Sequence, residues 1–169
     1  IDGGFLKEAG VEIREMNSGC ICCSLVGDFG EAMKEVVETY HPDRIVIEPS
    51  GVGKLSDVQG AVQKAAKDID VTLSSSTTVV DANKCKMYLR NFGEFFENQV
   101  EHAQTVILSR TDVAKPEKVQ EAVQLLTGKM KDGATLITTP IIQLSGKKLL
   151  DTMEEHPVSL AEEVLKEAA

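Results

Sequence analysis

Three of the chain's four cysteines lie within four residues, as Cys20, Cys22 and Cys23 in the stretch NSGCICCSL. Thiolates are soft ligands, and three of them within one turn of chain can hold a Zn²⁺ or Cu⁺ ion from one side. The stretch follows a predicted strand and precedes a predicted helix, where the helix dipole favours the negatively charged thiolate. Three thiols leave a fourth coordination position open, which suits exchange of the ion better than a permanent structural role.

Two other uses of these cysteines are compatible with their spacing. Cys20 and Cys23 alone form a C-x-x-C pair at a helix start, as in thiol oxidoreductases, although the intervening Cys22 invites wrong pairing. The thiols could also be small buried hydrophobic side chains, an interpretation that their clustering argues against. A disulfide framework is not expected, because adjacent Cys22 and Cys23 cannot bridge without an unfavourable peptide geometry.

A second candidate site follows the apolar run RIVIEP at residues 44–49, which predicts a strand buried on both faces. Glu48 stands near its end and Gly51 follows three residues later. A carboxylate at a strand end can orient a hydrated Mg²⁺, and a glycine at this distance can donate its N–H to a terminal phosphate. The nearby GVGK is not a P-loop, because G-x-x-x-x-G-K-[ST] would require Gly where the chain has Glu48, and Ser or Thr where it has Leu55.

A third candidate is Asp112, which lies just beyond a predicted strand at residues 105–109. One carboxylate can accept hydrogen bonds from both N1–H and N2–H of guanine. A site that depends on these bonds discriminates strongly against a base that lacks them. The alternative is that Asp112 caps the helix that begins near Pro116. This stretch alone is compatible with both interpretations.

The pattern of apolar residues predicts the fold that would position these groups. We expect strands at residues 11–16, 44–49, 70–81, 105–109 and 134–144, and helices at about 24–37, 55–67, 83–101 with a weak point at Gly93, 116–130 and from 159 onward. Their alternation indicates an α/β fold with a mainly parallel sheet and helices on both faces. Ligands bind such sheets at the carboxyl ends of the strands, so we expect the site in the loops that follow them.

Composition narrows the class of protein and its partners. The length of 169 residues suits one domain, and no apolar run approaches the roughly 18–20 residues that span a bilayer, so no membrane partner is expected. A formal net charge of −9 and an aromatic content of 4% argue against nucleic-acid binding. Free thiols suit a reducing cytoplasm. The scattered histidines His41, His102 and His156 are interpreted as surface or packing residues rather than ligands.

Taken together and in order, the stretches GCICCS, IVIEPSG and ILSRTD resemble the motifs of the CobW family of P-loop GTPases. These proteins are metal-handling relatives of the hydrogenase and urease maturation GTPases. The similarity covers about residues 1–150. The matching positions are Gly19, Cys20, Cys22 and Cys23 for the GCxCC segment, Glu48, Ser50 and Gly51 for an ExSG-like motif, and Asp112 for an NKxD-like guanine motif.

The resemblance implies a truncated P-loop NTPase-like fold. Residues 1–169 would form the central and C-terminal part of a GTPase domain, with the phosphate-binding loop upstream and a smaller C-terminal domain beyond residue 169. The parent protein would be a GTP hydrolase that uses GTP, GDP, Mg²⁺ and zinc to deliver a transition metal to a client metalloprotein or a cofactor-assembly enzyme, and it could form a homodimer. The chain alone is expected to hydrolyse GTP poorly or not at all, because it has no phosphate-cradling loop.

The resemblance also implies residue roles, and the chain departs from the family pattern at some of them. The implied roles are Cys20, Cys22 and Cys23 as metal ligands, Glu48 for Mg²⁺ or the attacking water, Gly51 for the γ-phosphate within a switch at 51–57, Ser109, Arg110 and Asp112 for the guanine motif, and Ser145 for the base or ribose. Ser109 replaces an Asn and is too short to make all its hydrogen bonds, whereas the Arg110 stem can still lie along a purine face. We therefore expect loosened base specificity, and a non-catalytic interaction module is the alternative.

Overall fold

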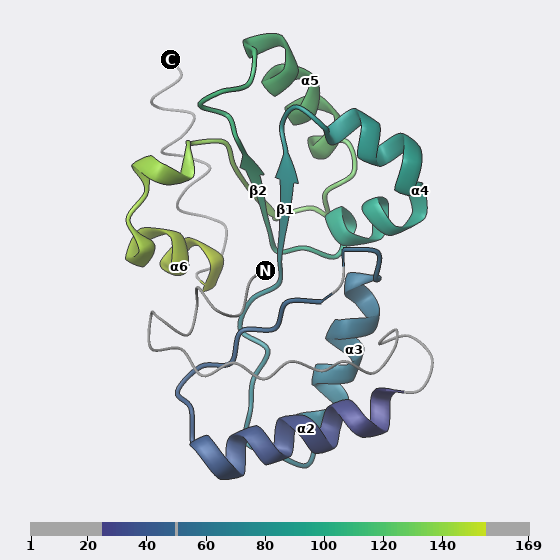
Figure 1. Cartoon of the computed structure of the whole chain (residues 1–169), viewed down its shortest axis with the longest axis vertical. Coiled ribbons are helices and arrows are strands. Elements are labelled where there is room, and N and C mark those ends of the chain that lie inside the picture. Colours follow the sequence, from purple (N-terminus) through teal and green to yellow (C-terminus); the bar gives the residue numbers. More distant parts are fainter. Residues whose placement is uncertain (1–24, 50, 155–169) are drawn as a thin grey trace.

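The structure, a computed structural model of the chain, describes residues 25–49 and 51–154 (Figure 1). The elements in chain order are α2 (Leu25–Tyr40), α3 (Leu55–Ala65), β1 (Thr77–Asp81), α4 (Cys85–Glu101), β2 (Thr105–Ser109), α5 (Pro116–Thr127), β3 (Thr135–Ile137), the 3₁₀ helix η1 (Ile141–Gln143) and α6 (Gly146–Glu154). The strand expected at 11–16, the helix expected from 159 and the three clustered cysteines lie outside the described residues. No helix in the described part is long and apolar enough to cross a membrane.

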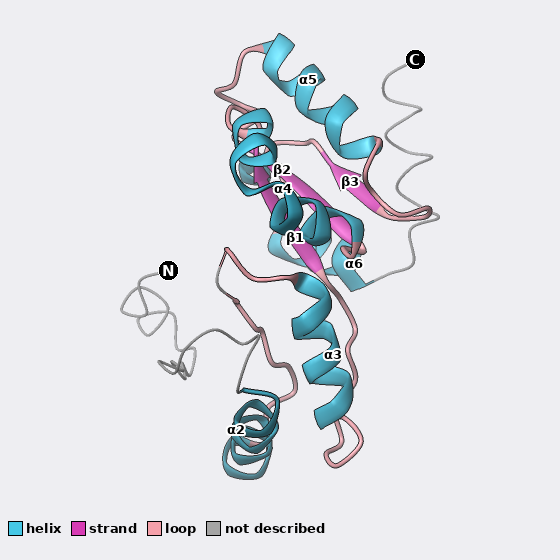
Figure 2. Ribbon diagram, turned by 90° about the vertical axis from the view of Figure 1, so that its right-hand side faces the viewer, coloured by secondary structure: helices cyan, strands magenta, loops and turns pink. Residues whose placement is uncertain are grey.

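The three strands form a parallel sheet in the order β1-β2-β3. Parallel neighbours need crossover connections, and α4 and α5 supply them between successive strands. Figures 1 and 2 place α4 and α5 on one side of the sheet and α6 on the other. The predicted α/β fold with a parallel sheet and helices on both faces is therefore confirmed.

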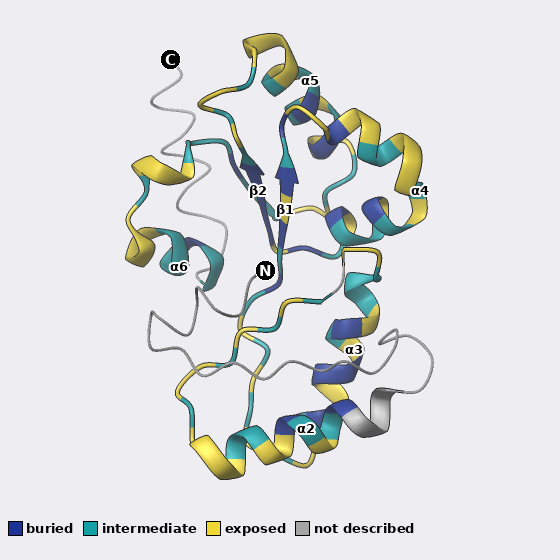
Figure 3. Cartoon of the chain, viewed as in Figure 1, coloured by how far each residue is buried: buried dark blue, intermediate teal, exposed yellow. Residues whose placement is uncertain are grey.

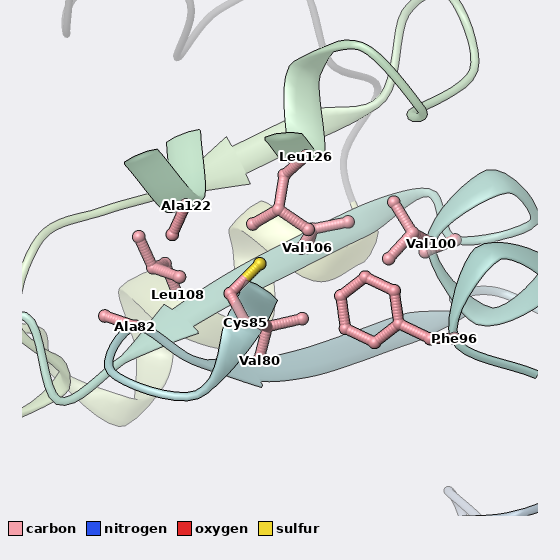
Figure 4. Close-up of a cluster of buried hydrophobic side chains, with 10 residues drawn as sticks. Val80, Ala82, Cys85, Phe96, Val100, Val106, Leu108, Ala122 and Leu126 are labelled. Carbon is pink, nitrogen blue, oxygen red and sulfur yellow. The ribbon is translucent and has the colours of Figure 1, made fainter. Parts of the chain in front are cut away.

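The main hydrophobic core lies between the sheet and the pair α4 and α5 (Figure 4). Successive residues of a strand point to opposite faces, so Val106 and Leu108 of β2 both face these helices. They meet Val100 of α4 and Leu126 of α5, and all four side chains are fully buried. On the opposite face of the sheet Val79 of the edge strand β1 is 62% exposed.

A second cluster joins α2 to α3 (Figure 3). Phe29 and Met33 are one helical turn apart on α2, and both are buried against Ala61 and Val62 of α3. This is the helix that the spacing of apolar residues predicts after residue 24. The α3 helix is likewise confirmed, although it ends at Ala65.

The strand predicted at residues 44–49 is wrong. This segment is extended but pairs with none of the three described strands. Ile45 and Ile47 are half-buried against the α2–α3 cluster, whereas Val46 is 85% exposed. The apolar run predicts burial on both faces, but a strand of that kind needs neighbours along both edges and layers over both faces. Only one side of this segment is covered by described residues.

Two further strands are shorter than predicted, and one helix was missed. Only Thr77–Asp81 of residues 70–81 forms a strand, and β3 ends at Ile137 rather than continuing to 144. Pro140 has no backbone N–H to give to a strand ladder, and it instead precedes η1. The helix α6 that follows is not predicted, since the sequence predicts a strand up to residue 144 and the next helix only from residue 159.

The α4 helix runs through Gly93 without the predicted weak point. A glycine inside a helix costs about 0.5–1 kcal/mol relative to alanine. Phe96 and Val100, both buried in the main core, follow on the same helix. Burial of two such side chains contributes about 1.5–3 kcal/mol each, so packing outweighs the local preference.

Candidate functional site

The carboxyl ends of β1 and β2 lie side by side, because Asp81 and Ser109 are register partners. The Ser109 hydroxyl donates to the carbonyl oxygen of Val80 at 3.1 Å, and the Ala82 amide donates to the Ser109 carbonyl at 3.1 Å. The short side chain of Ser109 therefore ties the ends of the two strands together. These two hydrogen bonds fix the position of the first residue of the predicted guanine motif.

Arg110 turns the chain sharply after β2. Its φ of 60° lies in the left-handed region, which is uncommon for a residue with a side chain. Its Nε lies 3.5 Å from Oδ2 of Asp81, and the other oxygen, Oδ1, accepts from the Asn83 amide at 2.8 Å. The Arg110 side chain is 65% exposed, so this ion pair contributes little stability. Strained residues of this kind cluster at functional sites, where the surroundings hold them in place.

Asp112 lies exposed in the turn that follows. The alternative that it caps α5 is wrong, since the N-cap residue of α5 is Lys115, and no side chain bonds there. Among the residues that the structure describes, the Asp112 carboxylate has no hydrogen-bond or ion-pair partner. Its neighbour Thr111 has a buried hydroxyl, Oγ1, with no partner there either. The loop at this edge of the sheet therefore presents one carboxylate and one hydroxyl that a polar ligand could satisfy.

The other predicted nucleotide residue, Ser145, is at the start of α6. Its hydroxyl accepts from the Lys148 amide at 3.1 Å, and its carbonyl accepts from the Leu149 amide at 3.0 Å. The hydroxyl thus serves an amide that the first turn of a helix leaves unpaired, and the carbonyl accepts the first bond within the helix. Ser145 is thus a helix cap and not a residue at the end of a strand, and a contact with base or ribose stays a prediction.

Glu48 and Gly51 belong to the segment before α3, and Gly51 lies away from the guanine loop. Both are exposed, and the Gly51 carbonyl accepts a hydrogen bond from Gln99 near the end of α4 at 3.0 Å. The Gln99 carbonyl in turn accepts from the Thr78 hydroxyl at 2.6 Å, close to the beginning of β1. Because α4 runs back along the sheet, its last turn lies at the amino end of β1 (Figure 1). The sequence predicts Gly51 at the same edge of the sheet as Asp112. The structure instead places Gly51 near the opposite end of the strands.

The predicted metal ligands Cys20, Cys22 and Cys23 lie outside the described residues, and the remaining thiol does not extend that site. Cys85 is buried in the main core, and Figure 4 shows its sulfur among apolar side chains. Burial, and secondarily the negative charge of Glu121, raises the pKa of this thiol to about 11. Cys85 is consequently protonated near neutral pH and is a poor ligand. Within 25–49 and 51–154 no group of three or more His, Cys, Asp or Glu residues is placed to hold a metal ion.

Sequence reasoning gave no role to two of the residues that organise this region, Asp81 and Asn98. Asp81 was detectable as an acid at the end of an apolar strand, which is the same signal that singled out Glu48. Asn98 and Gln99 form an adjacent pair of amide side chains on α4, and both bond to residues more than 40 positions earlier in the chain. Their spacing on a helix carries no information on such distant partners.

Comparison with known proteins gives the same family as the motifs. The family described as CobW/HypB/UreG, nucleotide-binding domain, matches residues 1–138. The chain is 28% identical over 141 residues to the zinc chaperone CobW of a Sinorhizobium species, with 67% of the chain and 40% of that protein covered. It is 25% identical over 128 residues to the zinc chaperone YjiA of Escherichia coli (strain K12), with 72% and 40% covered.

A third relative is the zinc chaperone YeiR of Escherichia coli (strain K12), which is 23% identical over 120 residues. The match covers 71% of the chain but 37% of YeiR, so the chain spans less than half the length of these three curated relatives. No solved structure matches the chain. The family match extends over residues 1–138 and includes all three motifs. The chain belongs to the CobW/HypB/UreG nucleotide-binding domain family.

Proposed function

We propose that the protein containing this chain is a GTP-dependent metallochaperone that handles zinc through the GCxCC segment and hydrolyses GTP to control its delivery. Family membership supports this proposal, as do three relatives that are themselves zinc chaperones. The observation that carries the guanine part is the exposed Asp112 carboxylate, beside the strained Arg110, at the carboxyl ends of β1 and β2. Ligands of open parallel sheets bind at this edge.

The base of GTP is proposed to bind in the loop of residues 109–112. The Asp112 carboxylate would accept hydrogen bonds from N1–H and N2–H of guanine, and adenine has no such pair of donors. The stem of Arg110 would lie along the face of the purine ring. The buried Thr111 hydroxyl would gain the hydrogen-bond partner that it lacks among the described residues.

The phosphate end of GTP is proposed to involve Glu48 and Gly51. Glu48 is an exposed carboxylate, a hard oxygen ligand of the kind that suits Mg²⁺ or holds the attacking water. Mg²⁺, when bound, neutralises charge on the terminal phosphates. The Gly51 amide would donate to the γ-phosphate. This part rests on the match to the family motif and not on proximity to Asp112, since Gly51 lies near the amino end of β1 and Asp112 follows the carboxyl end of β2.

The cargo is proposed to bind at the three clustered thiols. Cys20, Cys22 and Cys23 supply soft ligands in a set that leaves a position open for transfer. The acceptor would be a client metalloprotein or a metal-cofactor assembly enzyme in a reducing cytoplasm. The phosphate-binding loop would come from a part of the protein outside this chain, and the protein could act as a homodimer.

Glu48→Gln in the full-length protein tests the hydrolytic part. We expect kcat for GTP hydrolysis to fall by about 10²-fold or more, because a residue that positions Mg²⁺ or water contributes on that scale, while GTP affinity is retained. The matched control is Glu38→Gln on α2, which removes one exposed ion pair with Lys34. Steady-state phosphate release measures both. Unchanged turnover in Glu48→Gln would exclude Glu48 from the reaction, and a full-length wild type that hydrolyses no GTP would refute the proposed function.

A further inference from the structure

The end of α4 contacts residues between 51 and 59, which comprise the loop before α3 and the start of that helix. Glu94 and Asn98 of α4 and its C-cap residue, His102, are spaced by four and so lie on one face of the helix. Glu94 pairs with Lys54, and the His102 carbonyl accepts from the Gln59 side chain at 3.0 Å. One face of α4 is therefore docked along the start of α3 and the loop before it (Figure 2).

Gln99 makes two hydrogen bonds to the loop before α3. Its side-chain Nε2 carries two N–H groups, and it donates to the Gly51 carbonyl at 3.0 Å and to the Gly53 carbonyl at 2.7 Å. The backbone carbonyl of Gln99 is fixed in turn by the Thr78 hydroxyl of β1 at 2.6 Å. The amide group of Gln99 thus links the loop at residues 51–53 to the sheet through the helix.

Asn98 completes this contact at the start of α3. The first amides of a helix have no partner inside it, and no side chain caps α3 at its N-cap residue, Lys54. The Asn98 side chain accepts from the Ser56 amide at 3.2 Å and donates to the Ser56 hydroxyl at 3.0 Å. The cap of α3 therefore comes from α4, more than 40 residues later in the chain.

The loop between these contacts is exposed and rich in glycine. Gly51 is exposed, Val52 is 54% exposed, and two glycines in three residues give the backbone wide freedom. A Cβ added at Gly51 would meet no atom within 4 Å, and its φ does not require glycine. Packing therefore does not explain glycine at this position, whereas close approach of the backbone to a ligand would.

We propose that Gln99 and Asn98 are positioning residues that hold residues 51–56 in one conformation for GTP hydrolysis. This inference rests on the proposed function, because its role is to place the loop that carries Gly51. Gln99 holds the carbonyls of Gly51 and Gly53 by hydrogen bonds, and Asn98 holds Ser56 in the first turn of α3. Neither residue contacts the nucleotide; each acts through the backbone that it holds.

Gln99→Met in the full-length protein removes both donors and keeps an unbranched, helix-favouring side chain. Hydrogen–deuterium exchange of the amides at 52–56 is expected to become about tenfold faster, because the two bonds that restrain the loop are lost. In steady-state assays kcat for GTP should fall while KM stays unchanged, since the residues proposed for base binding are untouched. Gln99→Glu, of the same size but without the donors, should behave in the same way.

The matched control is Gln124→Met on α5, which changes an exposed glutamine and should alter neither exchange at 52–56 nor kcat. Unchanged exchange at 52–56 in both Gln99 variants would overturn the inference, and so would faster exchange with wild-type kcat. The exchange measurement does not depend on activity. Absent GTP hydrolysis in the wild type would therefore refute the proposed function, and the exchange result would still decide whether Gln99 restrains the loop.

Discussion

Asp112→Asn in the full-length protein is expected to move nucleotide preference from GTP to xanthosine triphosphate. A carboxylate accepts from both N1–H and N2–H of guanine, whereas an amide offers one acceptor and one donor. The amide donor faces a donor in guanine but a carbonyl in xanthine, so one base loses a hydrogen bond and the other gains one. GTP affinity should fall by about 10²-fold or more, because a polar group left unpaired in a base site is strongly penalised.

Titration with fluorescent GTP, ATP and xanthosine triphosphate measures the affinity of each variant for the three nucleotides. Asp112→Ala should bind GTP and ATP equally, since it removes both acceptors and adds no donor. Asp132→Asn makes the same chemical change at another exposed aspartate and should leave all three affinities as in wild type. If Asp112→Asn and Asp112→Ala keep the GTP preference of wild type, the assignment of the guanine site to this loop is wrong.

Replacing Cys20, Cys22 and Cys23 together by Ser is expected to abolish tight zinc binding by the full-length protein. A serine hydroxyl is a hard and weakly acidic group that does not replace a thiolate on Zn²⁺. Removing the ligands themselves should exceed the roughly 10–100-fold loss of affinity that follows removal of an outer partner. Competition with a chromophoric zinc chelator measures the affinity of each variant.

Cys85→Ala is the matched control for the loss of a thiol. Cys85 is buried in the main core and its pKa is raised to about 11, so its removal should leave zinc affinity unchanged. Zinc binding that survives the triple replacement would place the metal site elsewhere. A wild type that holds no zinc but cycles a Cys20–Cys23 disulfide against glutathione would favour the redox interpretation of the same residues.

The elements that the sequence predicts correctly are those with a regular apolar pattern and with nearby residues that mark where the element begins or ends. The α2, α3 and α5 helices begin near the predicted residues because apolar side chains recur at helical spacing. The bounds of β2 match the prediction, and its three central residues are all apolar. The failures lie where structure depends on neighbours. Residues 44–49 have the composition of a buried strand, but their burial depends on partners that composition does not specify.

The same holds for the candidate site: some of its features can be predicted from the sequence, and others depend on tertiary contacts. The position of Asp112 just after a strand could be predicted, because parallel strands end at a common edge. The contacts of Ser109 and Arg110 could not, since they depend on the register of β1 against β2 and on a left-handed backbone angle. The placement of Gly51 beside Gln99 is likewise a tertiary contact between residues 48 positions apart. Motifs therefore single out the candidate residues, and packing determines which of them are neighbours.

If GTP hydrolysis controls zinc delivery, the nucleotide state must change the affinity of the protein for zinc. The most direct test is a zinc competition titration of the full-length wild-type protein, saturated first with GDP and then with a non-hydrolysable GTP analogue. Coupling between two sites of a protein typically changes affinity by about 5–150-fold, and we expect the zinc affinity to differ between the two states within this range. Equal zinc affinity in the two states, with both nucleotides bound, would contradict it.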